Sequence, residues 1–257
     1  MKNPLRKRLP REFKGDIGKY IVILLLLILS MGFVSGFLVA DGSMIKSYDE
    51  SFEKYNIENG NFETMSELTD SQRSDIEKLG IKLYNNYYAD GTISDNKTVR
   101  IFADRKEVNK VCLMRGRLPK AENEIAIDRM FAENNKIEVG DKIEIFGKEK
   151  TITGYVALSD YSALFENNSD AMFDSVNFSV AIVTDDEFKS YDNIYYHYSY
   201  SWKYNDEPKD ISDEKEISDA LAAKLNQISP LKNFIPRYAN QSINFTREDM
   251  GGDRAMM

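Results

Sequence analysis

The residue types best suited to catalysis are scarce in this chain of 257 residues. It holds one histidine, His197, and one cysteine, Cys112. A single histidine cannot by itself complete a zinc site or a proton relay, and a single cysteine cannot form an internal disulfide. No Gly-x-Ser-x-Gly motif supplies a serine nucleophile. We therefore expect His197 to be a strand residue facing solvent or a neighbouring tyrosine, and Cys112 to be a small buried hydrophobic residue.

Nucleotide and metal chemistry also lack a motif. No glycine-rich phosphate loop is followed by Lys-Ser or Lys-Thr, and the scattered carboxylates match no calcium loop. We expect no catalytic residue, no cofactor and no metal ion, which predicts that the chain is not an enzyme. Any nucleotide hydrolysis linked to it must then be performed by a partner.

One aromatic pattern is a candidate surface for a ligand or partner. Five aromatic residues alternate with other residues, so on a β-strand their rings would all project from one face. They are Tyr196, Tyr198, Tyr200, Trp202 and Tyr204. Such a row can grip a glycan, a peptide or a partner domain. The alternative, a packing face within the domain's own sheet, is the more common arrangement.

The elements that position these residues begin with an apolar segment. Residues 21–40 are twenty consecutive uncharged residues. A helix of that length, at about 1.5 Å per residue, crosses a hydrocarbon layer of about 30 Å. We predict a transmembrane helix at residues 20–40. The alternative is a cleaved signal peptide, but its apolar core is usually only about 7–15 residues long.

Charge sets the expected orientation of this helix. Residues 1–19 carry seven basic and two acidic residues, a net charge of +5, whereas the remainder carries 27 basic and 40 acidic residues, a net charge of −13. The positive-inside rule places the N-terminus in the cytoplasm and the main domain outside the cell membrane. An acidic domain repels phosphate backbones, so we expect no nucleic-acid partner.

Residues 1–19 form the predicted cytoplasmic segment, and their pattern is amphipathic. Leu5, Leu9, Phe13 and Ile17 recur every four residues among basic side chains, with Pro10 between them. This pattern indicates a helix in the inner interface of the bilayer, kinked or broken at the proline. The alternative is a basic flank that only sets topology.

Small residues recur within the predicted span. Gly32, Gly36 and Ala40 are spaced by four and therefore line one face of the helix. Such spacing lets two membrane helices approach closely. Glycine is also common in membrane helices, so the spacing can arise by chance.

The remainder predicts an α+β fold, in which one N-terminal transmembrane helix precedes an extracytoplasmic mixed α/β domain with a small inserted β-rich subdomain. Thr69 and Gly80 frame a helix as N-cap and C-terminal glycine. The other expected elements are a stalk helix continuing to Asn56, strands at 61–65, 81–88 and 98–103, a turn-rich segment at 90–97, a compact unit at 111–158, a loop at 159–175 and a helix at 215–228.

Residues 116–147 read GRLPKAENEIAIDRMFAENNKIEVGDKIEIFG, which resembles the signature of the extracytoplasmic domain of FtsX-like, MacB-type ABC permeases. The start, NPLRKRLPREFKGDIGKY, resembles the beginning of large permeases of this family. The matching signature residues are Gly116, Arg117, Pro119, Asn123, Glu124, Val139, Gly140 and Asp141. Each also has a structural interpretation, as a glycine with unusual backbone angles, a turn-forming proline or a turn acceptor.

The resemblance implies a transmembrane permease subunit, or its N-terminal fragment. Such a subunit couples ATP hydrolysis by a separate cytoplasmic ATPase to motion of the extracytoplasmic domain, for export or mechanotransmission. It also implies a second permease copy or homologue and the lipid bilayer as partners. The expected domain spans residues 41–250, with its insertion at about 111–158, and residues 251–257 lead into a missing second span. The alternative is a single-span anchored surface domain that binds a ligand or partner.

Overall fold

The computed structural model describes residues 14–255. The chain divides into two compact units. One is a folded unit, Asp49–Asp249, and the other comprises the residues on either side of it. Each unit is described by itself.

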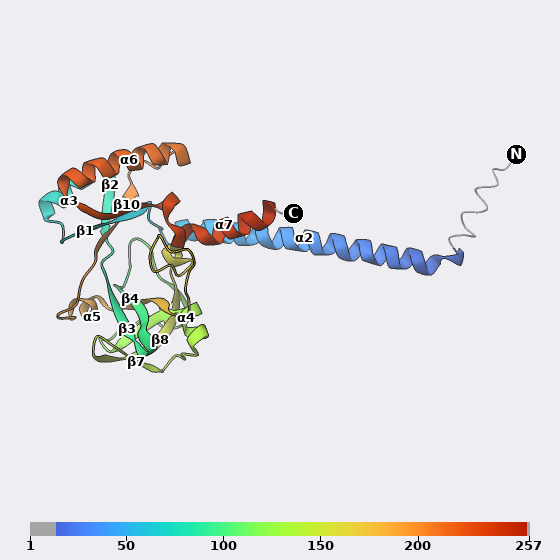
Figure 1. Ribbon diagram of the computed structural model, residues 1–257, viewed down its shortest axis with the longest axis horizontal. Helices are drawn as coiled ribbons and strands as arrows, with labels where there is room; N and C mark the ends of the chain where they lie inside the picture. The colour runs from blue at the N-terminus through green and yellow to red at the C-terminus, as the bar shows by residue number, and fades with distance from the viewer. Residues whose placement is uncertain (1–13, 256–257) are drawn as a thin grey trace. The chain divides into compact units, whose positions relative to one another are not determined.

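The helix α2 (Ile17–Lys54) contains the predicted membrane segment (Figure 1). Among residues 14–255 it is the one helix that is long and apolar enough to cross a membrane, and its side chains from Ile17 to Ala40 are exposed. The helix has no break between Ile17 and Lys54, which agrees with the predicted stalk. Of the amphipathic pattern only Ile17 is described, because Leu5, Leu9 and Phe13 lie outside the described residues.

The folded unit contains two sheets, each at the centre of a lobe. The four-stranded lobe is built on an antiparallel sheet of order β11-β1-β10-β2. Helices α3 and α6 pack against each other, α3 also against β2 and α6 also against β11. Its elements are β1 (Gly60–Thr64), α3 (Asp70–Glu77), β2 (Ile81–Asn85), β10 (Tyr198–Tyr204), α6 (Ile211–Ile228) and β11 (Leu231–Pro236).

The start of α3 follows the sequence prediction. The Thr69 hydroxyl accepts the backbone N–H of Gln72, and the Gln72 side chain accepts the backbone N–H of Thr69, a reciprocal cap that satisfies two otherwise free donors. Gly80 lies just beyond the helix with a φ of +92°, which glycine adopts without strain.

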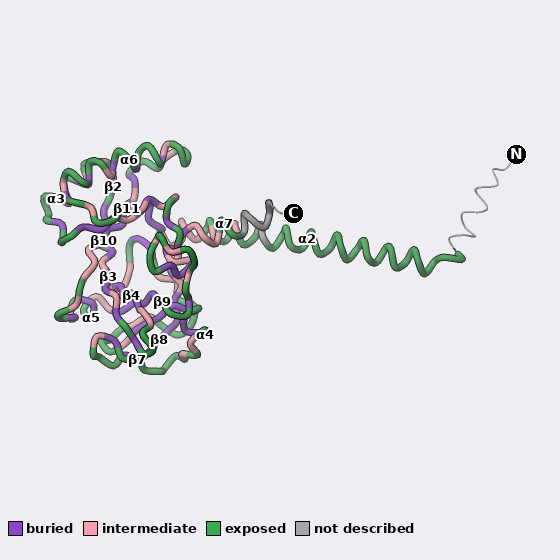
Figure 2. The backbone as a smooth tube through the Cα atoms, in the orientation of Figure 1, coloured by how far each residue is buried: buried purple, intermediate pink, exposed green. Residues whose placement is uncertain are grey.

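The seven-stranded lobe is built on a mixed sheet of order β3-β4-β9-β6-β8-β5, with β7 paired to β8. The pairs β4/β9 and β6/β8 are parallel. Figure 2 shows its central strands as buried. Its elements are β3 (Tyr88–Ile93), β4 (Lys97–Ala103), β5 (Cys112–Gly116), β6 (Glu124–Asp128), α4 (Arg129–Asn135), β7 (Lys142–Ile145), β8 (Lys148–Ala157), β9 (Phe178–Val183) and α5 (Asp185–Lys189).

The seven-stranded lobe is inserted into the four-stranded one, because the chain enters it after β2 and returns at β10. The expected insertion at residues 111–158 corresponds to β5 through β8. These strands share a sheet with β3, β4 and β9, so the lobe starts earlier in the chain than that range. The apolar helix followed by a mixed α/β domain confirms the predicted fold class.

Two local predictions were wrong. The expected strand at 81–88 ends at Asn85, and Tyr88 begins a strand of the other sheet. The turn-rich segment at 90–97 is partly strand, because β3 runs to Ile93. Gly91 suggested a turn, but a Cβ there would lie 2.6 Å from Cγ1 of Ile145. Glycine at this position permits a close approach within the sheet.

The helix α4 is capped by a buried carboxylate. Asp128 accepts the backbone N–H groups of Met130 at 2.7 Å and Phe131 at 3.1 Å. Burial raises the pKa of Asp128 to about 6 against the opposing effect of these two hydrogen bonds. The cap is therefore maintained at the cost of burying a charge at neutral pH.

The chain continues from β11 through a short 3₁₀ turn, Arg237–Ala239, into α7 (Gln241–Ala255). The expected lead-in at residues 251–257 lies partly in α7, and residues 256–257 are outside the described part of the chain.

Candidate functional site

A polar cavity of about 410 Å³ lies between the two lobes. Its lining includes Glu58 and Glu63 from the four-stranded lobe, and Arg100 and Asp160 from the seven-stranded lobe. All four residues are less than about a tenth exposed. Burying four ionisable groups requires partners for each, and those partners define the site.

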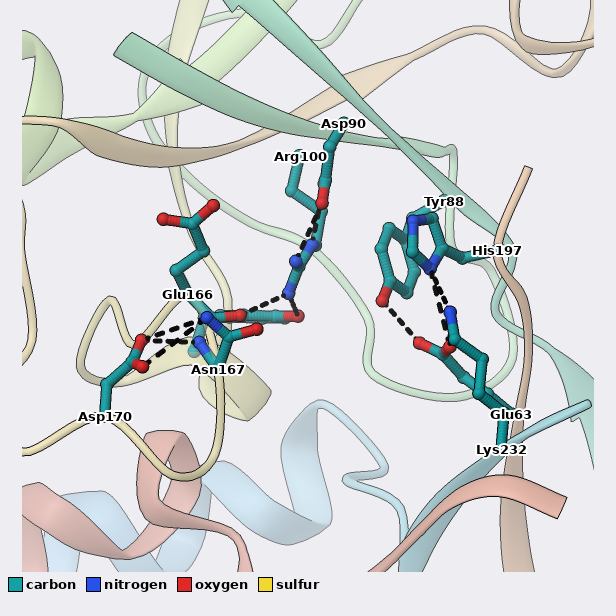
Figure 3. A network of polar contacts seen from close by, with 10 residues as sticks. Glu63, Tyr88, Asp90, Arg100, Glu166, Asn167, Asp170, His197 and Lys232 are labelled. Atoms are coloured by element: carbon teal, nitrogen blue, oxygen red, sulfur yellow. Dashed lines mark hydrogen bonds and ion pairs between the residues drawn. The ribbon is translucent and has the colours of Figure 1, made fainter. Parts of the chain in front are cut away.

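Glu63 is the centre of one cluster in this site (Figure 3). Its carboxylate accepts a hydrogen bond from the Tyr88 hydroxyl and lies 3.0 Å from Lys232 Nζ and 3.4 Å from His197 Nδ1. Burial opposes ionisation of Glu63, but the hydrogen bonds from His197, Tyr88 and Lys232 outweigh it and lower the pKa to about 2. Tyr88 belongs to β3 and Glu63 to β1, so this cluster joins the two sheets.

Arg100 is the centre of the second cluster. Its Nε and Nη2 donate to the two carboxylate oxygens of Asp90, each at 2.9 Å. Its Nη1 donates to the Tyr161 hydroxyl at 3.1 Å and to the Glu166 carbonyl at 3.0 Å. The guanidinium also lies 4.3 Å from the ring centroid of Tyr88. A planar guanidinium with every side engaged is fixed in place.

Glu166 belongs to a segment that we call the strap, residues 162–174. The strap also contacts the beginning of α7. The backbone N–H of Gln241 donates to Asn168 Oδ1 at 2.8 Å, and Asn168 Nδ2 donates to the Ala239 carbonyl at 2.9 Å. The rings of two strap phenylalanines, Phe165 and Phe173, pack on Phe245 with centroids 5.6 and 5.2 Å away. The strap therefore links the first turn of α7 to Arg100.

A third group of polar contacts surrounds Glu58. Its carboxylate accepts from Asn61 Nδ2 and Asn109 Nδ2, both at 2.6 Å, and from the Ser201 hydroxyl. Asp160 is paired with Arg105 Nη1 at 2.6 Å. Burial raises the pKa of both carboxyl groups, and the charge of Asp160 raises that of Glu58 further.

A second and larger groove of about 960 Å³ also lies between the lobes. Half-buried tyrosines from both lobes line it, together with charged residues. Some of the charges are paired: Lys82 with Glu107 at 3.5 Å, which joins the two lobes, and Lys106 with Asp185 at 2.9 Å, within the seven-stranded lobe. The tyrosines are Tyr84, Tyr87, Tyr196 and Tyr198.

The predicted aromatic row is divided by the fold. Tyr196 and Tyr198 line the larger groove, but Tyr200 and Trp202 are fully buried and Tyr204 is 8% exposed. The prediction of a ligand surface is wrong for these last three residues. They pack in the core of the four-stranded lobe, where Trp202 stacks on Phe234 at 4.8 Å. The packing alternative applies to them, because helices cover the face on which they project.

Several signature residues connect turns to β8 through backbone hydrogen bonds. Gly116 has a φ of +75° and pairs with Gly154, while the Arg117 backbone N–H donates to the Thr153 carbonyl at 3.0 Å. Arg117 donates to both carboxylate oxygens of Glu124, which also accepts the N–H of Lys120. These hydrogen bonds lower the pKa of Glu124 to about 2.

The second half of the signature makes similar contacts. Gly140 has a φ of +104° and donates its N–H to the Ile152 carbonyl at 2.8 Å. Asp141 accepts the N–H of Glu138 on its side chain and that of Ile152 on its carbonyl. The Asn123 carbonyl accepts the N–H of Thr151, also on β8. Val139 is 37% exposed, and Pro119 lies in irregular chain. These contacts are structural.

The remaining sequence candidates have plain positions. His197 was expected to face either solvent or a neighbouring tyrosine. Its ring stacks on the Tyr88 ring, with centroids 4.3 Å apart. Cys112 is half-buried and accepts a hydrogen bond from the Tyr55 hydroxyl at 2.9 Å, so it is less buried than the small buried hydrophobic residue that was predicted. Gly32 and Gly36 have no atom within 4 Å of a built Cβ, and helix packing through them and Ala40 stays a prediction.

The sequence could not have identified this site. Glu58, Asn109 and Ser201 are separated by 51 and 92 residues and meet only through the fold. The sequence offered only an indirect signal. Asn and Asp adopt left-handed backbone angles more readily than most residues, and Asn109 does so here with a φ of +47°. Within residues 14–255 no three His, Cys, Asp or Glu residues gather in a group that could hold a metal ion.

Comparison with known proteins finds similar solved structures, and two of them are given below. No protein-family model and no curated protein matches the chain. The extracellular domain of the ABC-type transporter YknZ from Gram-positive bacteria is 13% identical with a TM-score of 0.37, covering 68% of this chain and 98% of that one. The periplasmic region of MacB from Actinobacillus actinomycetemcomitans is 11% identical with a TM-score of 0.37, covering 74% of this chain and 91% of that one.

These neighbours are extracytoplasmic domains of the kind that the signature resembled. Identity and TM-score are both low. The function of this chain is therefore argued from its own residues and contacts.

Proposed function

We propose that the chain is a permease subunit, or the N-terminal part of one, of an FtsX-like, MacB-type ABC transporter. A separate cytoplasmic ATPase would hydrolyse ATP, and the folded unit would lie outside the membrane and move in response, for export or mechanotransmission. The observation that supports this most is α2, a single helix that contains the twenty-residue apolar stretch and also enters the folded unit.

The end of α2 contacts the seven-stranded lobe within the folded unit. The Tyr55 carbonyl accepts the N–H of Lys110 at 2.8 Å, and the Asn56 carbonyl accepts that of Asn109 at 3.1 Å. Asn56 Nδ2 also donates to the Glu107 carbonyl at 2.7 Å. A displacement of the helix end would therefore be passed to residues 107–112.

The beginning of α7 has a comparable connection through the strap. Asn168 Oδ1 accepts the backbone N–H of Gln241 in the first turn of α7, and the Glu166 carbonyl accepts a hydrogen bond from Arg100. Arg100 in turn lies over Tyr88, which is hydrogen-bonded to Glu63. Two helix ends thus lead to the interface between the lobes, an arrangement suited to converting helix movement into lobe movement.

The partners follow from the proposal. An ATPase would contact the cytoplasmic side, where the basic residues 1–19 precede the span. A second permease copy would pack against the span, with Gly32, Gly36 and Ala40 as the contact face. The lipid bilayer would surround the remaining apolar side chains of α2.

A single-span anchored binding domain is the second candidate function. It is favoured by the groove of about 960 Å³ with its four half-buried tyrosines, since rings presented in a concave site suit ligand binding. In that case no ATPase would accompany the chain.

Affinity purification of the full chain from its native membranes tests the choice. We expect an ABC ATPase with a phosphate-binding loop to co-purify in stoichiometric amounts, and an unrelated single-span bait to recover none. The chain alone should not bind ATP in calorimetry, because it has no such loop. Recovery without any ATPase under conditions that preserve other transporters would contradict the proposal and support the anchored binding domain.

A further inference from the structure

The strand β2 is an edge of the four-stranded sheet, since among the described residues it pairs with β10 alone. Successive residues of an antiparallel edge strand point their backbone groups alternately toward and away from the partner. Tyr84 and Asn86 face β10, because Tyr84 lies opposite Ser201 and the Asn86 N–H donates to the Ser199 carbonyl at 2.9 Å. Leu83 and Asn85 therefore present their N–H and carbonyl groups away from the sheet.

Two side chains of α3 occupy the place of a further strand at Leu83. The Leu83 N–H donates to Glu77 Oε1 at 3.2 Å, and Arg73 Nη1 donates to the Leu83 carbonyl at 3.3 Å. A neighbouring antiparallel strand would supply the same acceptor and the same donor from the backbone of one residue. The backbone groups of Asn85 have no such substitute among the described residues.

This edge forms one wall of the larger groove of about 960 Å³ between the lobes. Leu83 and Asn85 both line the groove. The Leu83 side chain is only 4% exposed and packs in the core of its lobe, so Leu83 reaches the groove through its backbone. Residues 102–108 and part of α5 form the opposite wall, and half-buried tyrosines from both lobes lie along it.

The groove differs in charge from the rest of the chain. Its lining holds five basic and four acidic residues, a net charge of +1, whereas residues 20–257 hold 27 basic and 40 acidic residues, a net charge of −13. A neutral or acidic segment can therefore enter the groove without the repulsion that the acidic surface elsewhere would impose. The same acidic surface opposes close approach of a second copy of this domain.

We propose that this groove binds an extended segment of a partner protein, neutral or acidic in charge, which adds to β2 as a further strand. The segment pairs its backbone with Leu83 and Asn85 and displaces the side chains of Arg73 and Glu77, while its alternate side chains contact the tyrosines. The proposal concerns the folded unit alone and applies equally to a permease subunit and to an anchored binding domain.

A selected peptide provides the probe. The full chain in detergent is panned against a phage-displayed library of random peptides of about eight residues, within the usual length of a strand. The most enriched peptide is synthesised with a fluorescein label and titrated by fluorescence polarisation, which should show saturable binding. No enrichment over panning without the protein would overturn the proposal.

N-methylated copies of this peptide test the backbone pairing without any change to the protein. Methylation of every second residue in one register removes the N–H groups that face β2, and it should weaken binding at least about tenfold. Methylation in the other register removes N–H groups that point away from β2, and it should leave the affinity unchanged. Equal effects in the two registers would show that the peptide does not bind as a strand and would overturn the proposal.

Replacement of Glu77 tests the position of the added strand. Glu77→Ala frees the Leu83 N–H, so the peptide no longer competes with a side chain and its affinity should rise several-fold. Asp75→Ala is the matched control, because it removes the same charge from the same helix at a half-exposed side chain that binds Lys78 and does not line the groove. An unchanged affinity in Glu77→Ala, or an equal rise in both variants, would show that α3 only protects the edge and would overturn the proposal.

Discussion

Replacing Gly116 with alanine tests the structural role of the signature. Gly116 has a φ of +75°, and a Cβ there would lie 2.4 Å from the Thr153 carbonyl oxygen and 2.9 Å from Gly154 Cα. Both are backbone atoms of β8, which cannot turn away as a side chain can. The left-handed conformation costs about 1–2 kcal/mol and overpacking about 1–3 kcal/mol. We therefore expect Gly116→Ala to lower the free energy of unfolding by about 3 kcal/mol.

Gly147 provides the matched control. Its φ of +70° is nearly the same, but nothing lies within 4 Å of a built Cβ. Gly147→Ala should therefore cost only the conformational part, about 1–2 kcal/mol. Gly154→Ala tests the same contact from β8, because its Cβ would lie 2.5 Å from the Arg117 carbonyl oxygen; Gly154 has no positive φ, so this variant should cost only the overpacking part, about 1–3 kcal/mol.

Thermal unfolding of the full chain in detergent, followed by circular dichroism, measures these costs. For a folded unit of about 200 residues, 1 kcal/mol corresponds to roughly 2–4 °C. The expected losses in melting temperature are about 10 °C for Gly116→Ala and about 4 °C for Gly147→Ala. Equal losses in the two variants would refute the argument that contact with β8 fixes this residue.

Three further predictions concern the cap of α4, the strap and the membrane orientation. Because the folded pKa of Asp128 is raised to about 6 from an ordinary value of 3.8, the folded state binds this proton more tightly, and stability is gained as the pH falls from about 6 to about 4. Asn168→Ala should cost about 1 kcal/mol and speed hydrogen exchange in the first turn of α7, whereas Asn167→Ala, whose side chain makes only local contacts, should not; equal exchange in both variants would exclude the strap contact. In intact cells lacking the native cysteine, a cysteine near residue 95 should react with a membrane-impermeant maleimide and one near residue 10 should not, and the reverse pattern would overturn the orientation.

Local structure was the most predictable part of the fold. The cap at Thr69, the glycine at 80 and the apolar spacing of α6 are signals within a few residues, and the structure has a helix at each place. The break between β2 and β3 was not predictable, because residues 81–88 show one strand-like pattern. Only the pairing with two different sheets ends the first strand at Asn85.

Burial of the aromatic row illustrates the same limit. Alternation shows that Tyr200, Trp202 and Tyr204 share a face, but it does not show whether another element covers that face. The cover comes from helices elsewhere in the chain. The interlobe site is less predictable still, because no local pattern marks Glu58 or Asp160 as buried.

The central claim is that movement passes along α2 into the folded unit. Insertion of four glycines after Gly42 would interrupt the helix, since glycine costs about 1 kcal/mol per residue relative to alanine. Insertion of four alanines adds the same length and keeps the helix, at roughly one turn. In the purified assembly with its ATPase, we predict an ATP-dependent change in hydrogen exchange at residues 107–112 that survives the alanine insertion and is lost with the glycine insertion. An ATP response that persists after the glycine insertion would contradict the account.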